Sequence, residues 1–92
     1  MQATVVIPVW NGETVLEDCL TAVFHHSQPH LQELICVENH SHDGSRQLIV
    51  DKFPQVTLLP QPTNLGFAGG VNAGLRAANT ELLVLLNQDC VV

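Results

Sequence analysis

Short apolar runs separated by helix-forming segments constrain the fold of this chain more than any other feature. The runs are rich in Val, Ile and Leu, as strands buried on both faces of a sheet are. They span residues 4–9, 34–37, 56–59 and 82–86. With a helix between successive runs, the order is β-α-β-α-β-α-β. This order predicts an α/β fold, a Rossmann-like parallel sheet with right-handed crossovers and flanking helices on both faces.

Three segments between these runs are expected to be helical. Apolar residues of the first, residues 13–24, and of the third, residues 66–78, recur three or four positions apart, which is typical of an amphipathic helix. A shorter helix is expected to end near Phe53, with Asp43 or Ser45 as its N-terminal cap. The glycines of the third helix are expected to allow close packing or close approach of a ligand. They are Gly66, Gly69, Gly70 and Gly74.

Polar residues follow the apolar runs, at the positions where an open parallel sheet binds ligands. These polar segments are Trp10-Asn11-Gly12, Glu38-Asn39, residues 64–66 and Asn87-Gln88-Asp89. Glu38 could accept hydrogen bonds from a ribose or a base, or it could be a solvated loop carboxylate. Asp89 offers the hard oxygen ligand that Mg²⁺ or Mn²⁺ prefers, and either ion could hold a diphosphate. An Asn-x-Asp sequence alone is more often a turn than a metal site.

The charge of the chain argues against nucleic acid as a ligand. The formal net charge is −6, with nine Asp and Glu residues against three Lys and Arg residues. Neutralising the phosphates of a nucleic acid takes several Lys or Arg side chains on one face. An anionic nucleotide would instead be held by backbone N–H groups, helix N-termini and a metal ion.

Cysteine usage and hydropathy indicate a cytoplasmic protein. Cys19, Cys36 and Cys90 lie in apolar segments without C-x-x-C spacing, so reduced thiols in the core are expected. The chain starts on a strand, and no apolar stretch approaches the ~20 residues that a membrane span needs. Membrane association is expected only through segments outside this sequence.

Other chemistries fit the sequence less well. Residues 66–74 are rich in glycine but follow the third strand, whereas a dinucleotide fingerprint follows the first; a P-loop Lys is also missing. This disfavours NAD-dependent oxidoreductases and P-loop NTPases. The five histidines show no ligand pairs at zinc spacing, so they are expected on loops or the surface. Trp10 could stack on a base or fill an edge of the core.

Taken together, four motifs in this order resemble the N-terminal part of the family 2 glycosyltransferases, which are inverting nucleotide-diphosphosugar enzymes with the GT-A fold. The motifs are residues 5–11, 37–45, 64–74 and 85–89. The third motif is similar to the rhamnosyltransferase-like branch, which acts on polysaccharide or cell-wall acceptors. The resemblance implies that residues 1–92 are the nucleotide-sugar-binding half of a glycosyltransferase domain, truncated after a DXD-like motif.

The resemblance also implies roles for individual residues. The backbone near Pro8 and Val9, together with Glu38, would hold the pyrimidine base and ribose of a UDP- or dTDP-linked sugar. The residues implied to line the nucleotide pocket are Asn64, Gly66 and Asn72. Further candidate contacts for the nucleotide sugar are Trp10, Asn11, Asn39, Asp43 and Asn87.

At the diphosphate end, Asp89 would be the last residue of the DXD-like tip and would bind Mg²⁺ or Mn²⁺. The chain departs from the family pattern here, because Asn87 replaces the first Asp and Gln88 replaces a Pro common in this branch. Glu38 likewise stands where the family more often has Asp. The general base and the acceptor-binding region are expected beyond Val92.

The implied reaction is inverting transfer of the sugar, by direct displacement, to a saccharide or lipid-linked acceptor. The 92 residues alone are expected to be inactive. The alternative from another class is a non-catalytic nucleotide-binding or interaction module that has the same fold.

Overall fold

The chain folds as the predicted succession of strands and helices. The computed structural model describes residues 3–27, 31–78, 80 and 82–88. Its strands are β1 (Ala3–Val9), β2 (Leu31–Glu38), β3 (Thr57–Pro60) and β4 (Leu82–Leu85). Its helices are α1 (Leu16–Ser27), α2 (Ser45–Lys52) and α3 (Gly66–Ala77).

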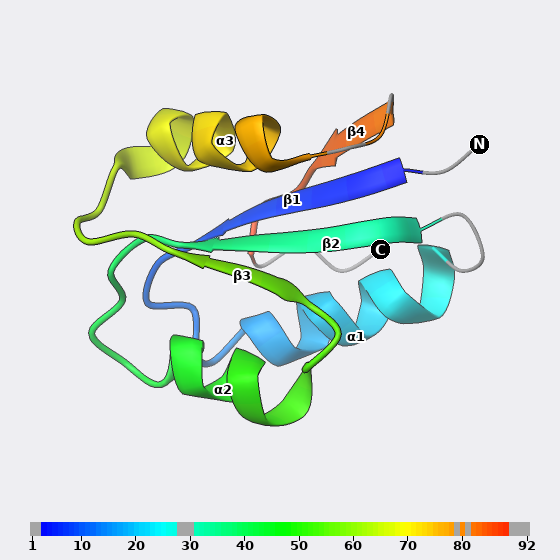
Figure 1. Ribbon diagram of the computed structural model, residues 1–92. Helices are drawn as coiled ribbons and strands as arrows, with labels where there is room; N and C mark the ends of the chain where they lie inside the picture. Colours follow the sequence, from blue (N-terminus) through cyan, green and yellow to red (C-terminus); the bar gives the residue numbers. More distant parts are fainter. Residues whose placement is uncertain (1–2, 28–30, 79, 81, 89–92) are drawn as a thin grey trace.

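The strands form one parallel sheet of order β3-β2-β1-β4. Helices α1 and α2 cover one face of this sheet and α3 covers the other (Figure 1). The central strand β1 pairs with β2 from Ala3↔Leu31 to Val9↔Glu38 and with β4 from Ala3↔Leu82 to Val6↔Leu85. The predicted α/β fold, with helices on both faces of a parallel sheet, is confirmed.

Several element boundaries differ from those expected. Helix α1 starts at Leu16 rather than near Glu13, because the carbonyl of Gly12 accepts hydrogen bonds from the amides of Val15 and Leu16 and closes a turn first. Strand β2 is longer than predicted, since its first residues pair with the start of β1. Strand β3 is displaced by one residue, to Thr57–Pro60.

The cap predicted for α2 was wrong. The residue that precedes the helix is Gly44, and it makes no side-chain cap hydrogen bond. Ser45 is instead the first helical residue, and its amide donates to Oδ1 of Asp43 at 2.9 Å. The Asp43 carboxylate, which lies one residue before the cap position Gly44, thus accepts a hydrogen bond from the first N–H of the helix.

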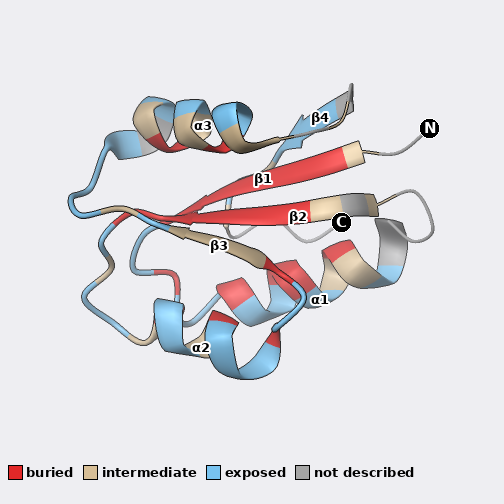
Figure 2. Cartoon of the chain, in the orientation of Figure 1, coloured by how far each residue is buried: buried red, intermediate tan, exposed pale blue. Residues whose placement is uncertain are grey.

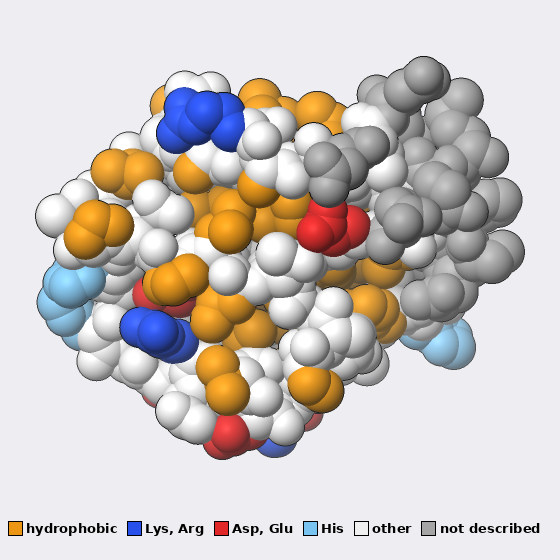
Figure 3. All heavy atoms as spheres, viewed as in Figure 1, with side chains coloured by type: hydrophobic (Ala, Val, Ile, Leu, Met, Phe, Trp, Pro, Cys, Tyr) orange, Lys and Arg blue, Asp and Glu red, His pale blue; other side chains and the backbone are white. Residues whose placement is uncertain are grey.

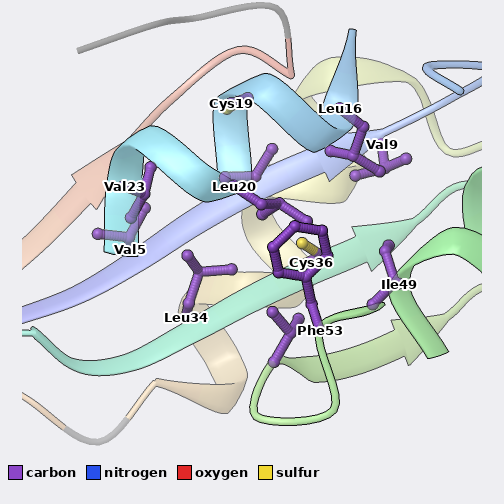
Figure 4. Close-up of a cluster of buried hydrophobic side chains, with 12 residues drawn as sticks. Val5, Val9, Leu16, Cys19, Leu20, Val23, Leu34, Cys36, Ile49 and Phe53 are labelled. Carbon is purple, nitrogen blue, oxygen red and sulfur yellow. The ribbon is translucent and has the colours of Figure 1, made fainter. Parts of the chain in front are cut away.

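The main core lies between the sheet and the helices α1 and α2. Alternate residues of β1, namely Val5, Ile7 and Val9, face this layer, as the two-residue period of a strand requires. Side chains from both helices and from β2 meet them there (Figure 4). Figure 2 shows that β1 is buried along most of its length.

The predicted core cysteines are buried where the structure describes them. Cys19 and Cys36 are buried in the main core, and Cys90 lies outside the described residues. Burial, reinforced by the neighbouring Cys19, raises the pKa of the Cys36 thiol far above its usual value. Cys36 is therefore an uncharged core residue.

A second, smaller core lies under α3. Val6, Ile35 and Val37 are buried on this face of the sheet. A Cβ atom at Gly74 would collide with the Val6 side chain, and one at Gly70 would press on Pro8 and on the Asn39 amide. The predicted close packing is confirmed at these two glycines, which let α3 lie against the end of β1.

Strand β4 forms an edge of the described sheet and is apolar. The exposed fractions of Leu83, Val84 and Leu85 are 37%, 36% and 44%.

On the face drawn in Figure 3, hydrophobic side chains form a broad area, while Lys and Arg side chains are scattered. Within the part of the chain that the structure describes, none of the helices has the length and apolar character to cross a membrane.

Candidate functional site

A cavity of about 580 Å³ opens at the carboxyl ends of the strands, where the topology predicts a ligand site. Its walls come from the end of β1 and the turn before α1, the end of β2, the loop before α3, and the segment after β4. The lining residues are Pro8, Val9, Trp10, Asn11, Thr14, Val15, Asn39, Asn64, Gly66, Asn87 and Gln88.

Every residue that lines this cavity is uncharged. The polar groups are carboxamides and the hydroxyl of Thr14, and the aromatic group is the Trp10 indole, which is 47% exposed. Trp10 therefore does not fill a core edge, and the prediction that it stacks on a base stays open. Carboxamides with an exposed aromatic ring suit a neutral, polar and planar ligand group.

Hydrogen bonds link the loop after β1, which lines the cavity at Asn11, to the loop after β2. We call these contacts, between residues 11–13 and 41–45, the loop clasp. The amide of Asn11 donates to Oγ of Ser41 at 3.0 Å, and Oδ1 of Asn11 accepts from the amide of His42 at 2.8 Å. Asn11 has a left-handed backbone conformation, with φ of 48°, which Asn adopts more easily than most residues.

In the second part of the loop clasp, each loop donates a backbone amide to a carboxylate of the other loop. The amide of Glu13 donates to Oδ2 of Asp43 at 3.1 Å, while the amide of Gly44 donates to Oε1 of Glu13 at 3.1 Å. Below them, the amide of Gly12 donates to the buried Oγ of Ser45 at 2.8 Å. The start of α1 and the start of α2 are thus fixed relative to each other.

Asp43 acts in the clasp rather than on the cavity wall. Partial burial alone would raise the pKa of its carboxyl, but hydrogen bonds from the side chain and amide of Ser45 and from the amide of Glu13 outweigh this and lower it. Asp43 does not line the cavity, and neither does Asn72, which is exposed on α3. Their assignment to the nucleotide site stays a prediction.

Glu38 and Asn39 are buried at the end of β2. Glu38 is 3% exposed, and its Oε1 accepts from the amide of Ser41 at 2.8 Å, so the reading as a solvated loop carboxylate is wrong. It does not line the cavity, and its contact with base or ribose stays a prediction. The Nδ2 of Asn39 donates to the carbonyl of Gly66 at 3.2 Å and thereby holds the start of α3 at the cavity.

The segment after β4 contributes Asn87 and Gln88. The carbonyl of Asn87 accepts a hydrogen bond from Sγ of Cys19 at 3.7 Å. The Gln88 carboxamide accepts from the amide of Trp10 and donates to its carbonyl, both at 2.9 Å. Asp89, the predicted metal ligand, lies outside the described residues.

The polar segment after β4 carries oxygen donors that bear on metal binding. Among the residues that the structure describes, no three His, Cys, Asp or Glu side chains gather to hold an ion. The amide oxygen of Asn87 and the carboxylate of Asp89, two positions further along the sequence, are hard donors of the kind that Mg²⁺ and Mn²⁺ take. The residue types at this tip therefore fit either ion.

Most predicted site residues come together, and three lining residues had no predicted contact role. The structure gathers Pro8, Val9, Trp10, Asn11, Asn39, Asn64, Gly66 and Asn87 around the cavity. These are Thr14, Val15 and Gln88, of which only Gln88 belongs to a polar segment that the sequence placed at this end of the sheet. Thr14 and Val15 could have been found, because the turn between a first strand and its helix borders the ligand site of such sheets.

Solved glycosyltransferases share this fold. The mannosyltransferase PcManGT from Pyrobaculum calidifontis, solved in complex with GDP-Man and Mn²⁺, gives a TM-score of 0.88 at 26% identity, covering 98% of this chain and 28% of that one. S. aureus TarS 1-349 in complex with UDP gives a TM-score of 0.85 at 25% identity, covering 97% of this chain and 28% of that one. The fold is thus the GT-A fold of glycosyltransferases.

The chain belongs to glycosyl transferase family 2, because the model of that family, "Glycosyl transferase family 2", matches residues 4–92. Poly(ribitol-phosphate) beta-glucosyltransferase from Bacillus spizizenii is 28% identical over 94 residues, which cover 97% of this chain and 15% of that protein. The chain spans only 15% and 35% of the length of two curated relatives that it matches. The family predicted from the four motifs is confirmed.

Proposed function

We propose that the cavity binds the nucleoside part of a nucleotide-diphosphate sugar, and that the whole protein transfers this sugar to an acceptor. The observation that carries the proposal is the uncharged cavity at the carboxyl ends of β1 and β4, with the exposed Trp10 indole in its wall. Its volume of about 580 Å³ lies in the range of small-molecule sites. Membership of family 2 supports the same reading.

The base and ribose are the parts of the donor that this lining suits. Trp10 would stack on the base, and the carboxamides of Asn11 and Asn64 would supply donors and acceptors for base and ribose edges. We propose a UDP- or dTDP-linked donor. The UDP complex of TarS supports a uridine nucleotide, and the GDP-Man complex of PcManGT makes GDP the comparison to test.

The diphosphate needs charge compensation that the cavity lining lacks, since it contains neither Lys nor Arg. We propose that Asp89 holds Mg²⁺ or Mn²⁺, which would offset the negative charge of the departing nucleoside diphosphate. The DXD-like sequence of the tip and the Mn²⁺ in the PcManGT complex support this.

Transfer itself is proposed for the whole protein, because this chain spans only part of its relatives. The sugar would pass to a saccharide or lipid-linked acceptor with inversion, by direct displacement, with a general base outside residues 1–92. The glycine-rich motif of residues 64–74 supports a place in the rhamnosyltransferase-like branch and in cell-wall or polysaccharide synthesis. The buried cysteines support a location in the cytoplasm. The name of the Bacillus relative, which acts on poly(ribitol-phosphate), supports a polymer acceptor.

Calorimetric titration of the chain with UDP, dTDP and GDP, each with and without Mn²⁺, tests the proposal. We expect pyrimidine nucleotides to bind, and we expect Mn²⁺ to strengthen the binding. Asp89→Ala should remove the gain from Mn²⁺, because the ion loses its carboxylate ligand.

Asp51→Ala is the matched control, since Asp51 is exposed on α2 and bonds only locally, to Gln47. It should bind UDP as the wild type does. A folded wild-type chain that binds none of these nucleotides would overturn the proposal and favour a non-catalytic interaction module. Preference for GDP would overturn only the assignment of a pyrimidine donor and would leave the proposal of a nucleotide-sugar site standing.

A further inference from the structure

The side chain of Gln88 holds the backbone of Trp10 at two points. Its Oε1 accepts from the Trp10 amide and its Nε2 donates to the Trp10 carbonyl, each at 2.9 Å. The carboxamide thus satisfies both backbone groups of Trp10, as a neighbouring strand would. The two residues lie 78 positions apart in sequence, so this contact joins the two ends of the described chain.

The contact begins where backbone pairing between β1 and β4 stops. The last registered pair is Val6↔Leu85, followed by a bond from the amide of Leu86 to the carbonyl of Val6 at 3.1 Å. A longer parallel ladder would next use the N–H of residue 8, and Pro8 has none. Beyond Pro8 the side chain of Gln88 therefore continues the connection between the two strands.

Gly12 leaves the room that the Gln88 carboxamide occupies. A Cβ atom at Gly12 would collide with Oε1 and Cδ of Gln88. The φ angle of Gly12 is not in the left-handed region, so the close approach of Gln88, rather than the backbone, favours glycine there. The loop after β1 thus accommodates the Gln88 side chain through Gly12, while the segment after β4 supplies Gln88 itself.

We propose that Gln88 is a positioning residue for donor binding: it fixes the Trp10 backbone so that the exposed indole is held ready to stack on the base. The inference rests on the proposed function, because it assigns a role at the same cavity. A chain without Gln88 would have to order Trp10 during binding, and ordering one side chain lowers affinity.

The intrinsic fluorescence of Trp10 tests this directly. The chain contains one Trp and no Tyr, so Trp10 is the single reporter. Time-resolved anisotropy at one dilute concentration separates the local motion of this ring from tumbling of the whole molecule. Gln88→Ala should lower the anisotropy of the ligand-free chain and weaken UDP binding by roughly threefold to tenfold. Gln88→Met removes both hydrogen bonds at similar side-chain length and should behave in the same way.

Gln47→Ala is the matched control, because Gln47 is exposed on α2 and donates only to Asp51, at 2.8 Å. It should leave the anisotropy and the UDP affinity unchanged. The inference is overturned if both Gln88 variants keep the wild-type anisotropy, or if both keep the wild-type UDP affinity. This holds even if the variants unfold at a lower temperature, because Gln88 would then have a purely structural role. Absence of UDP binding in the wild-type chain would instead contradict the proposed function, so the two failures are distinguishable.

Discussion

Trp10 is the residue on which the proposed site depends most. It is the only Trp of the chain, it is 47% exposed, and its backbone is held by Gln88 rather than by core packing of the ring. An exposed indole beside carboxamides has little structural reason to be there. We therefore expect the Trp10 indole to contribute to nucleotide binding rather than to folding.

Trp10→Leu should weaken UDP binding by about 1–3 kcal/mol, the range measured for removing an aromatic ring that stacks on a base. The free energy of unfolding should change by less than about 0.5 kcal/mol, because the ring is exposed. Calorimetry with UDP and urea unfolding measure the two quantities. Val50→Ala, at an exposed apolar position on α2, is the control, and equal losses of UDP affinity in both variants would contradict the role of Trp10.

At the scale of elements, the loop clasp sets how α1 and α2 begin relative to the cavity. In it, backbone amides donate hydrogen bonds to the Asp43 carboxylate, the Glu13 carboxylate and the Ser45 hydroxyl. Because Asp43 is more acidic in the folded chain than usual, its contribution to stability depends on pH.

Asp43→Asn should lower the free energy of unfolding at pH 7 by up to about 1 kcal/mol, a modest loss because the carboxylate is exposed. A lowered folded-state pKa contributes stability that is present above the unfolded pKa, about 4, and is lost as the pH falls through the folded pKa. The difference between wild type and variant should therefore shrink below about pH 4. Urea unfolding across pH measures it, with Asp51→Asn as the control; a difference that grows at acid pH would refute the assignment.

Helix α3 depends on glycine for its contact with β1. Gly74→Ala should destabilise the chain by about 1 kcal/mol, because overpacking against Val6 costs about 1–3 kcal/mol and outweighs a gain in helix propensity of about 1 kcal/mol. In a Val6→Ala background the same change should cost less, since the collision is relieved. Urea unfolding of the four chains of this cycle measures the coupling, and strict additivity would contradict the assigned contact.

Element order and the location of the site could be predicted from the sequence, whereas details that depend on distant partners could not. Apolar periodicity gives the strands and helices, and the topology of a parallel sheet places the site at their carboxyl ends. The early start of β2 depends on pairing with β1, and the late start of α1 depends on the Gly12 carbonyl. The Gln88 contact joins positions 78 residues apart and has no local signal.

At the scale of the whole molecule, the exposed apolar edge at β4 should promote self-association. Unpaired strand edges with apolar side chains are templates for pairing between chains. We expect the weight-average mass of the 10.0 kDa chain to rise with concentration in sedimentation experiments. The double change Leu83→Lys and Leu85→Lys should suppress this rise. Val50→Lys on α2 should not, and a wild-type mass of 10.0 kDa at every concentration would contradict the prediction.

A UDP titration of the ¹⁵N-labelled chain, followed in ¹H–¹⁵N NMR spectra, shows where the nucleotide binds. We expect shift changes to concentrate at the amides around the cavity, namely those of Trp10, Asn11, Gly66 and Gln88. Amides of α2, such as those of Gln47 and Val50, should stay unchanged. Shift changes centred on α2, or no changes in a well-folded chain, would contradict the proposal that this cavity binds the nucleotide.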